Sequence, residues 1–112
     1  MRERNLERRL VKAVKNMGGL AMKFVSPGMA GVPDRLVLLP GGKMAFVEMK
    51  APGEKPKPLQ RLRHAQIRDL GFRVYMVDSV EQIGEILSEI CNHNDSEGGP
   101  EDDRKALRDE SL

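Results

Sequence analysis

Residues 31–50 read GVPDRLVLLPGGKMAFVEMK. Two apolar runs flank the Pro-Gly-Gly sequence at residues 40–42, and this pattern predicts two antiparallel strands joined by a tight turn. With the turn there, Asp34 at the start of the first strand lies opposite about residue 48, which is a glutamate. The hairpin therefore brings two carboxylates together at one end of a sheet.

A lysine joins the two acids because side chains alternate between the two faces of a strand. Glu48 and Lys50 therefore project from the same face, near the end of the second strand and beside Asp34. Two adjacent carboxylates repel each other and raise each other's pKa unless a cation bridges them. Hard oxygen ligands favour Mg²⁺ or Mn²⁺ over zinc. The three side chains thus predict a site for a divalent metal and a phosphodiester.

The rest of the chain alternates between helical and strand patterns. The predicted elements are helices at residues 3–17, 59–70 and from 78 or 79 to about 92, and strands at residues 20–25, 35–39, 43–50 and 72–77. In the second helix, we expect apolar contacts from Leu59, Leu62, Ile67 and Leu70.

The order of the elements is α-β-β-β-α-β-α. The first three strands are expected to form a meander, and the fourth follows a helix, so it joins the sheet by a right-handed crossover. The predicted fold class is α/β, a small mixed sheet with flanking helices.

The chain has 112 residues, of which 39% are hydrophobic and 32% charged, which fits one soluble domain with an aliphatic core. No apolar run reaches the length of a membrane span, and the charged N-terminus lacks the apolar core of a secretion signal. A single cysteine, Cys91, excludes an intramolecular disulfide and a multi-cysteine zinc site. We therefore expect a cytoplasmic protein with no membrane partner.

Charge is unevenly distributed along the chain. Residues 94–112 carry a net charge of −4, which leaves +6 on residues 1–93. The sequence predicts one ordered domain over residues 1–93 and an acidic, disordered tail over residues 94–112. A basic body suits a polyanionic partner, although ordinary solubility explains it equally well. The tail is expected to solvate the protein; the alternative is that it competes with DNA for the basic body.

Several polar residues outside the hairpin have both a functional and an ordinary explanation. Glu7 lies at the edge of the apolar stripe of the first helix, where it is either a third acid of the site or half of an ion pair. Glu3, one turn earlier, is expected to be solvated. Gln60 is most simply an exposed residue of a first helical turn, and His64 a surface histidine.

These motifs together resemble the virus-type replication–repair nuclease (VRR-NUC) domain of the PD-(D/E)XK superfamily. The resemblance covers about residues 3–90. It rests on the following runs: Gly18-Gly19, Lys23-Phe24, Ser26-Pro27-Gly28, Gly31-Val32-Pro33-Asp34-Arg35, Gly41-Gly42, Phe46-Val47-Glu48-Met49-Lys50-Ala51-Pro52-Gly53, Pro58-Leu59-Gln60 and Gly71-Phe72-Arg73-Val74.

The resemblance implies a restriction-endonuclease-like core and metal-dependent cleavage of phosphodiester bonds. Asp34 and Glu48 would be metal ligands together with the backbone carbonyl of Met49, and Glu7 would support the metal, directly or through water. Lys50 would orient the attacking water or offset charge on the phosphorane. Gln60 would lie at the rim of the site. The resemblance also implies a homodimer, often phage-encoded and then located in the host cytoplasm.

We therefore expect an endonuclease that cleaves DNA with Mg²⁺ or Mn²⁺ and selects DNA structure, such as branches, rather than sequence. Basic residues near the site would contact the DNA backbone without reading sequence: Lys23, Arg35, Lys55 and Lys57. One alternative is a non-catalytic nucleic-acid-binding module, although such a module has no need of an acid pair that repels phosphate. A second alternative is a hydrolase of RNA or nucleotides.

Overall fold

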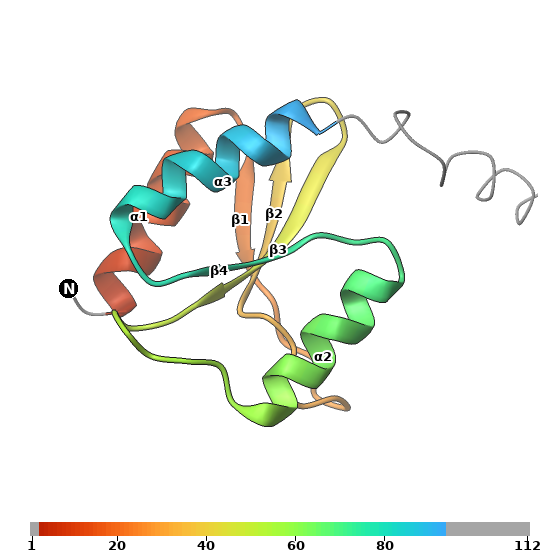
Figure 1. The fold of residues 1–112 in the computed structure, drawn as a ribbon. Helices are drawn as coiled ribbons and strands as arrows, with labels where there is room; N and C mark the ends of the chain where they lie inside the picture. The colour runs from red at the N-terminus through yellow and green to blue at the C-terminus, as the bar shows by residue number, and fades with distance from the viewer. Residues whose placement is uncertain (1–2, 94–112) are drawn as a thin grey trace, which may run out of the picture.

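The computed structural model describes residues 3–93 and confirms the predicted α/β fold class (Figure 1). Its elements are α1 (Glu3–Asn16), β1 (Leu20–Lys23), β2 (Arg35–Leu39), β3 (Lys43–Met49), α2 (Pro58–Asp69), β4 (Val74–Val77) and α3 (Val80–Asn92). None of the helices between residues 3 and 92 is long and apolar enough to cross a membrane. The acidic tail predicted for residues 94–112 lies outside the described residues.

The four strands form one mixed sheet in the order β1-β2-β3-β4. The first three strands are antiparallel and form the predicted meander, whereas β4 is parallel to β3. Arg35 pairs with Val47, so the residue before β2 lies opposite residue 48. The predicted register, which places Asp34 beside Glu48, is therefore confirmed.

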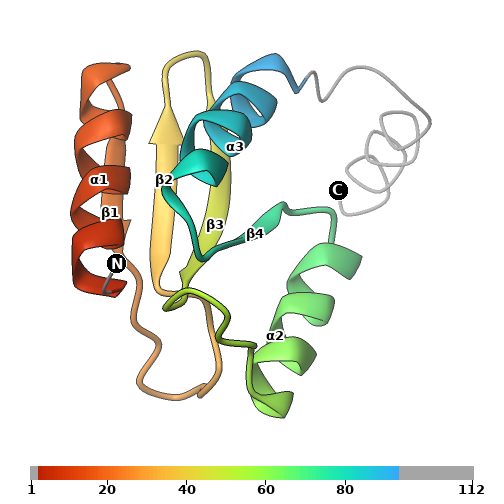
Figure 2. The same ribbon diagram turned by 60° about the vertical axis from the view of Figure 1, so that its left-hand side comes forward.

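The apolar core lies between the sheet and the helices α1 and α3, which cover the same face (Figure 2). Helix α1 contributes Leu6, Leu10 and Val14, all fully buried, because residues at this spacing share one side of a helix. Their neighbours in the core come from the sheet and from α3: Val37, Leu39, Ala45, Val47, Met49, Val77, Ile83, Ile86, Leu87 and Ile90.

Helix α2 lies apart from α1 and α3 (Figure 2), and the apolar contacts predicted for it are wrong at three positions. Leu59, Leu62 and Leu70 are exposed, with 42%, 50% and 76% of their surface accessible. The one buried residue of α2 is His64. The packed side of this helix is polar because it faces Glu48 rather than the apolar core.

Strand β4 begins at Val74 instead of the predicted residue 72. Phe72 donates its backbone N–H to the carbonyl of Ile67, and Gly71 donates to that of Arg68. These two bonds close the C-terminus of α2 in the manner of a Schellman motif, with Gly71 at a φ of 96°. Phe72 is therefore part of the helix cap. Strand β1 also ends two residues early, at Lys23, before the turn at residues 26–28.

Candidate active site

The first acid of the predicted site, Asp34, lies at the open end of the hairpin. Its Oδ2 accepts a hydrogen bond of 2.9 Å from the backbone N–H of Met49. On the other side, the backbone carbonyl of Asp34 accepts a bond of 2.7 Å from Phe24 N–H. Asp34 is therefore held between β1 and β3, and the backbone of Met49, whose carbonyl is a predicted metal ligand, lies next to its carboxylate.

The glycine of the Gly31-Val32-Pro33-Asp34 motif is required by a close approach of α2. A Cβ at residue 31 would lie 2.9 Å from both Leu59 Cγ and the Leu59 carbonyl oxygen. Gly31 also has a φ of 87°, which L side chains rarely adopt. The chain leading into Asp34 thus packs directly against the start of α2.

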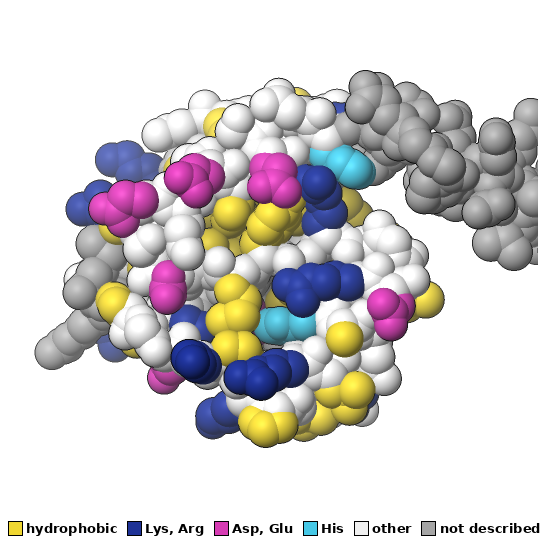
Figure 3. Space-filling model, viewed as in Figure 1, with side chains coloured by type: hydrophobic (Ala, Val, Ile, Leu, Met, Phe, Trp, Pro, Cys, Tyr) yellow, Lys and Arg dark blue, Asp and Glu magenta, His cyan; other side chains and the backbone are white. Residues whose placement is uncertain are grey.

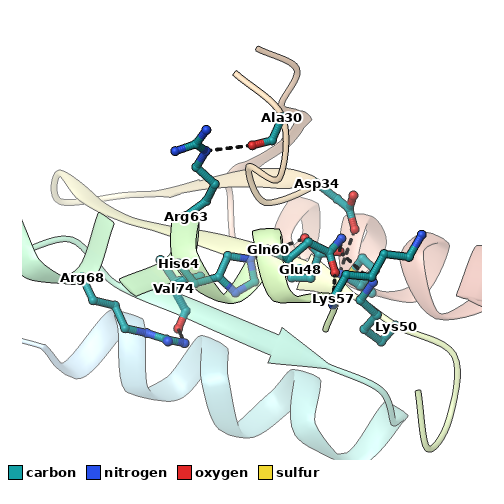
Figure 4. A network of polar contacts seen from close by, with 11 residues as sticks. Ala30, Asp34, Glu48, Lys50, Lys57, Gln60, Arg63, His64, Arg68 and Val74 are labelled. Atoms are coloured by element: carbon teal, nitrogen blue, oxygen red, sulfur yellow. Dashed lines mark hydrogen bonds and ion pairs between the residues drawn. The ribbon is translucent and has the colours of Figure 1, made fainter. Parts of the chain in front are cut away.

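The second acid, Glu48, is almost completely buried, with 1% of its surface accessible. Its Oε2 accepts a hydrogen bond of 3.3 Å from Gln60 Nε2 and lies 3.6 Å from Lys50 Nζ (Figure 4). Lys50 is itself 7% exposed. The carboxylate of Glu48, on β3, thus has two polar neighbours. Lys50 directly follows β3, and Gln60 lies on α2.

The electrostatics of this cluster are unfavourable for a carboxylate. Burial, followed by the neighbouring Asp34 carboxylate, raises the pKa of Glu48 to about 8 against the opposing effect of Lys50. Two carboxylates held together in a buried place share protons unless a cation is near. The donor set of Asp34 and Glu48 therefore fits a hard divalent cation.

Gln60 is fixed at both ends of its amide. Its Oε1 accepts a hydrogen bond of 2.9 Å from the backbone N–H of Lys57, the N-cap residue of α2, while its Nε2 donates to Glu48. Because the helix cap holds the amide oxygen, the amide nitrogen is directed at the carboxylate. Gln60 thus links the start of α2 to Glu48.

His64 is a member of the cluster that the sequence did not predict. It was expected on the surface, yet only 2% of it is accessible, and its Nε2 lies 3.7 Å from Glu48 Oε1. Within residues 3–93, neither of these two buried atoms has a hydrogen-bond partner. Burial, followed by the charges of Arg68 and Lys50, lowers the pKa of His64. The spacing of His64 from Gln60, four residues on the same side of a helix, was the signal available.

Glu7 adopts the alternative that the sequence left open, an ion pair. Its Oε1 accepts a hydrogen bond of 2.9 Å from Arg35 Nε and forms an ion pair with Arg35 Nη2 at 2.8 Å. Arg35 also donates to the carbonyl of Ala21, at 3.1 Å. A role of Glu7 at a metal stays a prediction. Glu3 is exposed as expected, but partial burial and the charges of Asp34 and Glu54 raise its pKa, so it is electrostatically coupled to the site.

The remaining basic candidates lie on β1 and in the loop that precedes α2. Lys23 pairs with Arg35 across β1 and β2, and Lys55 and Lys57 lie in the loop between Lys50 and α2. The three lysines are exposed. Over residues 3–93, no group of three His, Cys, Asp or Glu side chains forms a preassembled metal cluster. Two carboxylates suffice for Mg²⁺, which usually keeps several water ligands.

An acid before β2 and a Glu-x-Lys sequence at the end of β3, joined by the hairpin, define an α/β domain of the PD-(D/E)XK class. No protein-family model matches the sequence. The chain is 52% identical over 90 residues to "Putative nuclease p44" of Acyrthosiphon pisum secondary endosymbiont phage 1. The aligned region covers 80% of this chain and 96% of that protein.

A solved structure described as "VRR_NUC domain" is similar to the chain with a TM-score of 0.72 and 33% sequence identity. The similarity covers 77% of this chain and 94% of that one. The chain belongs to the VRR-NUC family, as the motifs of its sequence predicted.

Proposed function

We propose that the protein is a nuclease that hydrolyses DNA phosphodiester bonds with the help of Mg²⁺ or Mn²⁺. The observation that carries the proposal is the buried Glu48, whose pKa is raised to about 8 beside Asp34, with Lys50 Nζ at 3.6 Å. A buried carboxylate pair of this kind favours binding of a divalent cation, which would also offset the negative charge that a phosphodiester brings to the same place. The phage relative is named as a nuclease, which supports nuclease activity.

Asp34 and Glu48 would hold the metal together with the backbone carbonyl of Met49. A bound divalent ion lowers the pKa of a water molecule and stabilises charge on phosphoryl oxygens. Lys50 carries its positive charge next to Glu48, where it would orient the attacking water or offset charge on the phosphate in the transition state. Lys50 thus contributes a positive charge, which the two acids cannot supply.

Gln60 and His64 would act as positioning residues for Glu48. Gln60 donates to Oε2, whereas His64 lies next to Oε1, so the two carboxylate oxygens have different neighbours (Figure 4). Residues that hold a metal ligand in place are often nearly as important for metal affinity as the ligand itself. In this proposal, α2 fixes the direction of the Glu48 carboxylate.

A homodimer is part of the proposal because exposed apolar side chains remain on the part of the sheet face opposite the core that lies beside the Glu48 cluster. Leu20, Met22 and Phe72 are exposed, at 60%, 41% and 47%. Phe72 stacks edge-on against Phe46, with ring centroids 6.5 Å apart, on the face opposite the core. Hydrophobic side chains also reach the surface between α2 and α3 (Figure 3). A second copy would cover this face, and two sites could cut two strands.

Sedimentation at micromolar concentration without DNA tests the dimer. A two-fold mass for the wild-type protein and a single mass for Met22→Lys would support it. A monomeric wild-type protein would contradict it.

Cleavage assays test the activity itself. We expect the wild-type protein to cut one or more of a panel of branched, nicked and linear DNA substrates in Mg²⁺ or Mn²⁺, and Lys50→Ala to bind them without cutting. Identical products from both proteins on every substrate would contradict the catalytic role of Lys50. Binding without cleavage by the wild-type protein would support the binding-module alternative. Preferential cutting of RNA would support the RNA hydrolase instead.

A further inference from the structure

A basic groove lies between α1 and the β1 edge of the sheet, and neither Asp34 nor Glu48 lines it. It has a volume of about 590 Å³ and is lined by Arg4, Glu7, Arg8, Val11, Lys12, Lys15, Lys23 and Arg35. Six of these residues are cations and one is an acid. The single acid, Glu7, forms an ion pair with Arg35. The groove therefore keeps a strong positive charge.

The cations of α1 share one side of the helix. Arg4, Arg8, Lys12 and Lys15 are spaced by four, four and three residues, which places them in one row. Like charges one turn apart repel and weaken a helix. Within residues 3–93 none of these four side chains forms an ion pair with an acid. A row of unpaired cations in a groove is therefore unfavourable for the free protein and suited to an anionic ligand.

The length of the row indicates a polymer rather than a small anion. Eleven residue steps along α1 at 1.5 Å each correspond to about 16 Å. Phosphates of one strand of B-DNA advance about 3.4 Å along the axis, so the row matches about five phosphates. One phosphate ion would engage only one end of it.

One end of the groove lies near the candidate active site, because Glu3 in the first turn of α1 is electrostatically coupled both to Asp34 and to Glu7, which lines the groove. Lys23 and Arg35 line its far wall and are cross-strand partners, and Arg35 directly follows Asp34. The outer side of α3, by contrast, carries acids, which gather over that helix in Figure 3. A nucleic-acid backbone that leaves the site therefore meets cations along α1 and repulsion along α3.

We propose that the groove between α1 and β1 binds the sugar–phosphate backbone of the nucleic acid on one side of the cleavage point. The inference rests on the proposed nuclease function. It assigns Arg8 and Lys12 to phosphate contacts several nucleotides from the reacting bond. The contacts carry no sequence information, because they reach phosphates and not base edges.

The test measures binding of a labelled DNA duplex in EDTA, where no cleavage occurs, over a series of salt concentrations. Arg8→Gln with Lys12→Gln should lower the slope of log affinity against log salt by about 2, since each lost phosphate contact contributes roughly 0.9. The matched control is Arg9→Gln, an exposed arginine on the same helix that does not line the groove. It should leave the slope unchanged.

Equal salt slopes for the double variant and Arg9→Gln would contradict the proposed role of the groove. The proposal would also fail if the wild-type protein bound polyglutamate as tightly as DNA and the double substitution weakened both complexes equally. The outcome is separate from that of the cleavage assay. If the wild-type protein cuts no nucleic acid but the double variant has a smaller salt slope, the groove is supported as a DNA-binding site and the nuclease proposal fails. If the wild-type protein cuts DNA and the slope is unchanged, the groove alone fails. Circular dichroism of each variant checks that α1 still folds.

Discussion

Glu48 and Met49 are neighbours on β3 and are equally buried, yet they lie in opposite environments. Met49 points into the apolar core under α1 and α3, where burial stabilises the fold. Glu48 points toward α2, where burial raises its pKa and lowers the stability of the ionised form. One face of the sheet holds the fold together, while the other maintains an arrangement that is unfavourable until a cation binds.

The largest expected effect lies on the unfavourable face. Glu48→Gln should lower the rate of DNA cleavage about 10³-fold, which corresponds to about 4 kcal/mol of transition-state stabilisation. The same change should stabilise the metal-free protein at neutral pH, because residue 48 is ionised in the unfolded chain but has its pKa raised to about 8 on folding, and a neutral amide avoids this cost. Initial rates in Mg²⁺ and urea denaturation in EDTA measure the two effects. A variant that keeps the wild-type rate would remove Glu48 from the proposed metal site.

The matching change on the apolar face should act on stability alone. Leu10→Ala should reduce the free energy of unfolding by about 3 kcal/mol, because it leaves a cavity among fully buried neighbours. The cleavage rate per folded molecule should stay the same. Urea denaturation monitored by circular dichroism gives the stability. A large loss of rate in the folded fraction would show that the two faces are not independent.

The pH dependence of stability distinguishes the faces without altering the core. Because the folded-state pKa of Glu48 is raised to about 8 from 4.5, its contribution is fully present below pH 4.5 and is lost as the pH rises through 8. We expect the metal-free protein to lose on the order of 2 kcal/mol over this window, less than the full ~1.4 kcal/mol per pKa unit because the site relaxes.

Glu48→Gln should have no such loss, and Mg²⁺ should remove it from the wild-type protein. Urea denaturation in EDTA and in Mg²⁺, at a series of pH values between 4 and 9, measures all three curves. Parallel curves for the wild-type protein and the variant would assign the pH dependence to other groups.

The smallest expected effect concerns His64. His64→Leu keeps most of the volume but removes the ring nitrogen near Glu48 Oε1, and it should weaken Mn²⁺ binding about 10-fold. His64→Gln, which supplies an amide N–H donor in place of the ring, should recover part of that affinity. Calorimetric titration with Mn²⁺ compares both with Leu62→Ala, an exposed position on the same helix. If His64→Leu bound Mn²⁺ with wild-type affinity, the role of the histidine would be restricted to packing.

The sequence predicted the apolar face much better than the polar one. Leu6, Leu10 and Val14 repeat at helical spacing, and the runs of β2 and β3 flank a glycine turn, so their positions follow from periodicity alone. The register that joins Asp34 to Glu48 follows from the same turn. These features depend on residues that lie close together in the sequence.

The errors occurred where packing is polar or depends on distant segments. Helix α2 buries His64 and leaves Leu62 exposed, which reverses the usual relation between polarity and burial. The partner of Glu7 could not be chosen from periodicity, because Arg35 lies 28 residues away on another element. The groove along α1 likewise could not be predicted from the sequence of the helix alone, because Lys23 and Arg35 of the neighbouring strands form its other side.

The position of α2 in the chain has a consequence for folding. This helix lies in the segment that connects β3 to its parallel neighbour β4, and pairing across such a connection forms slowly compared with the hairpin of β2 and β3. Gln60 and His64 reach Glu48 only when that connection has closed. A chain still emerging from the ribosome would carry Asp34 and Glu48 before Gln60 and His64 are synthesised, and we expect the site to be completed late in folding.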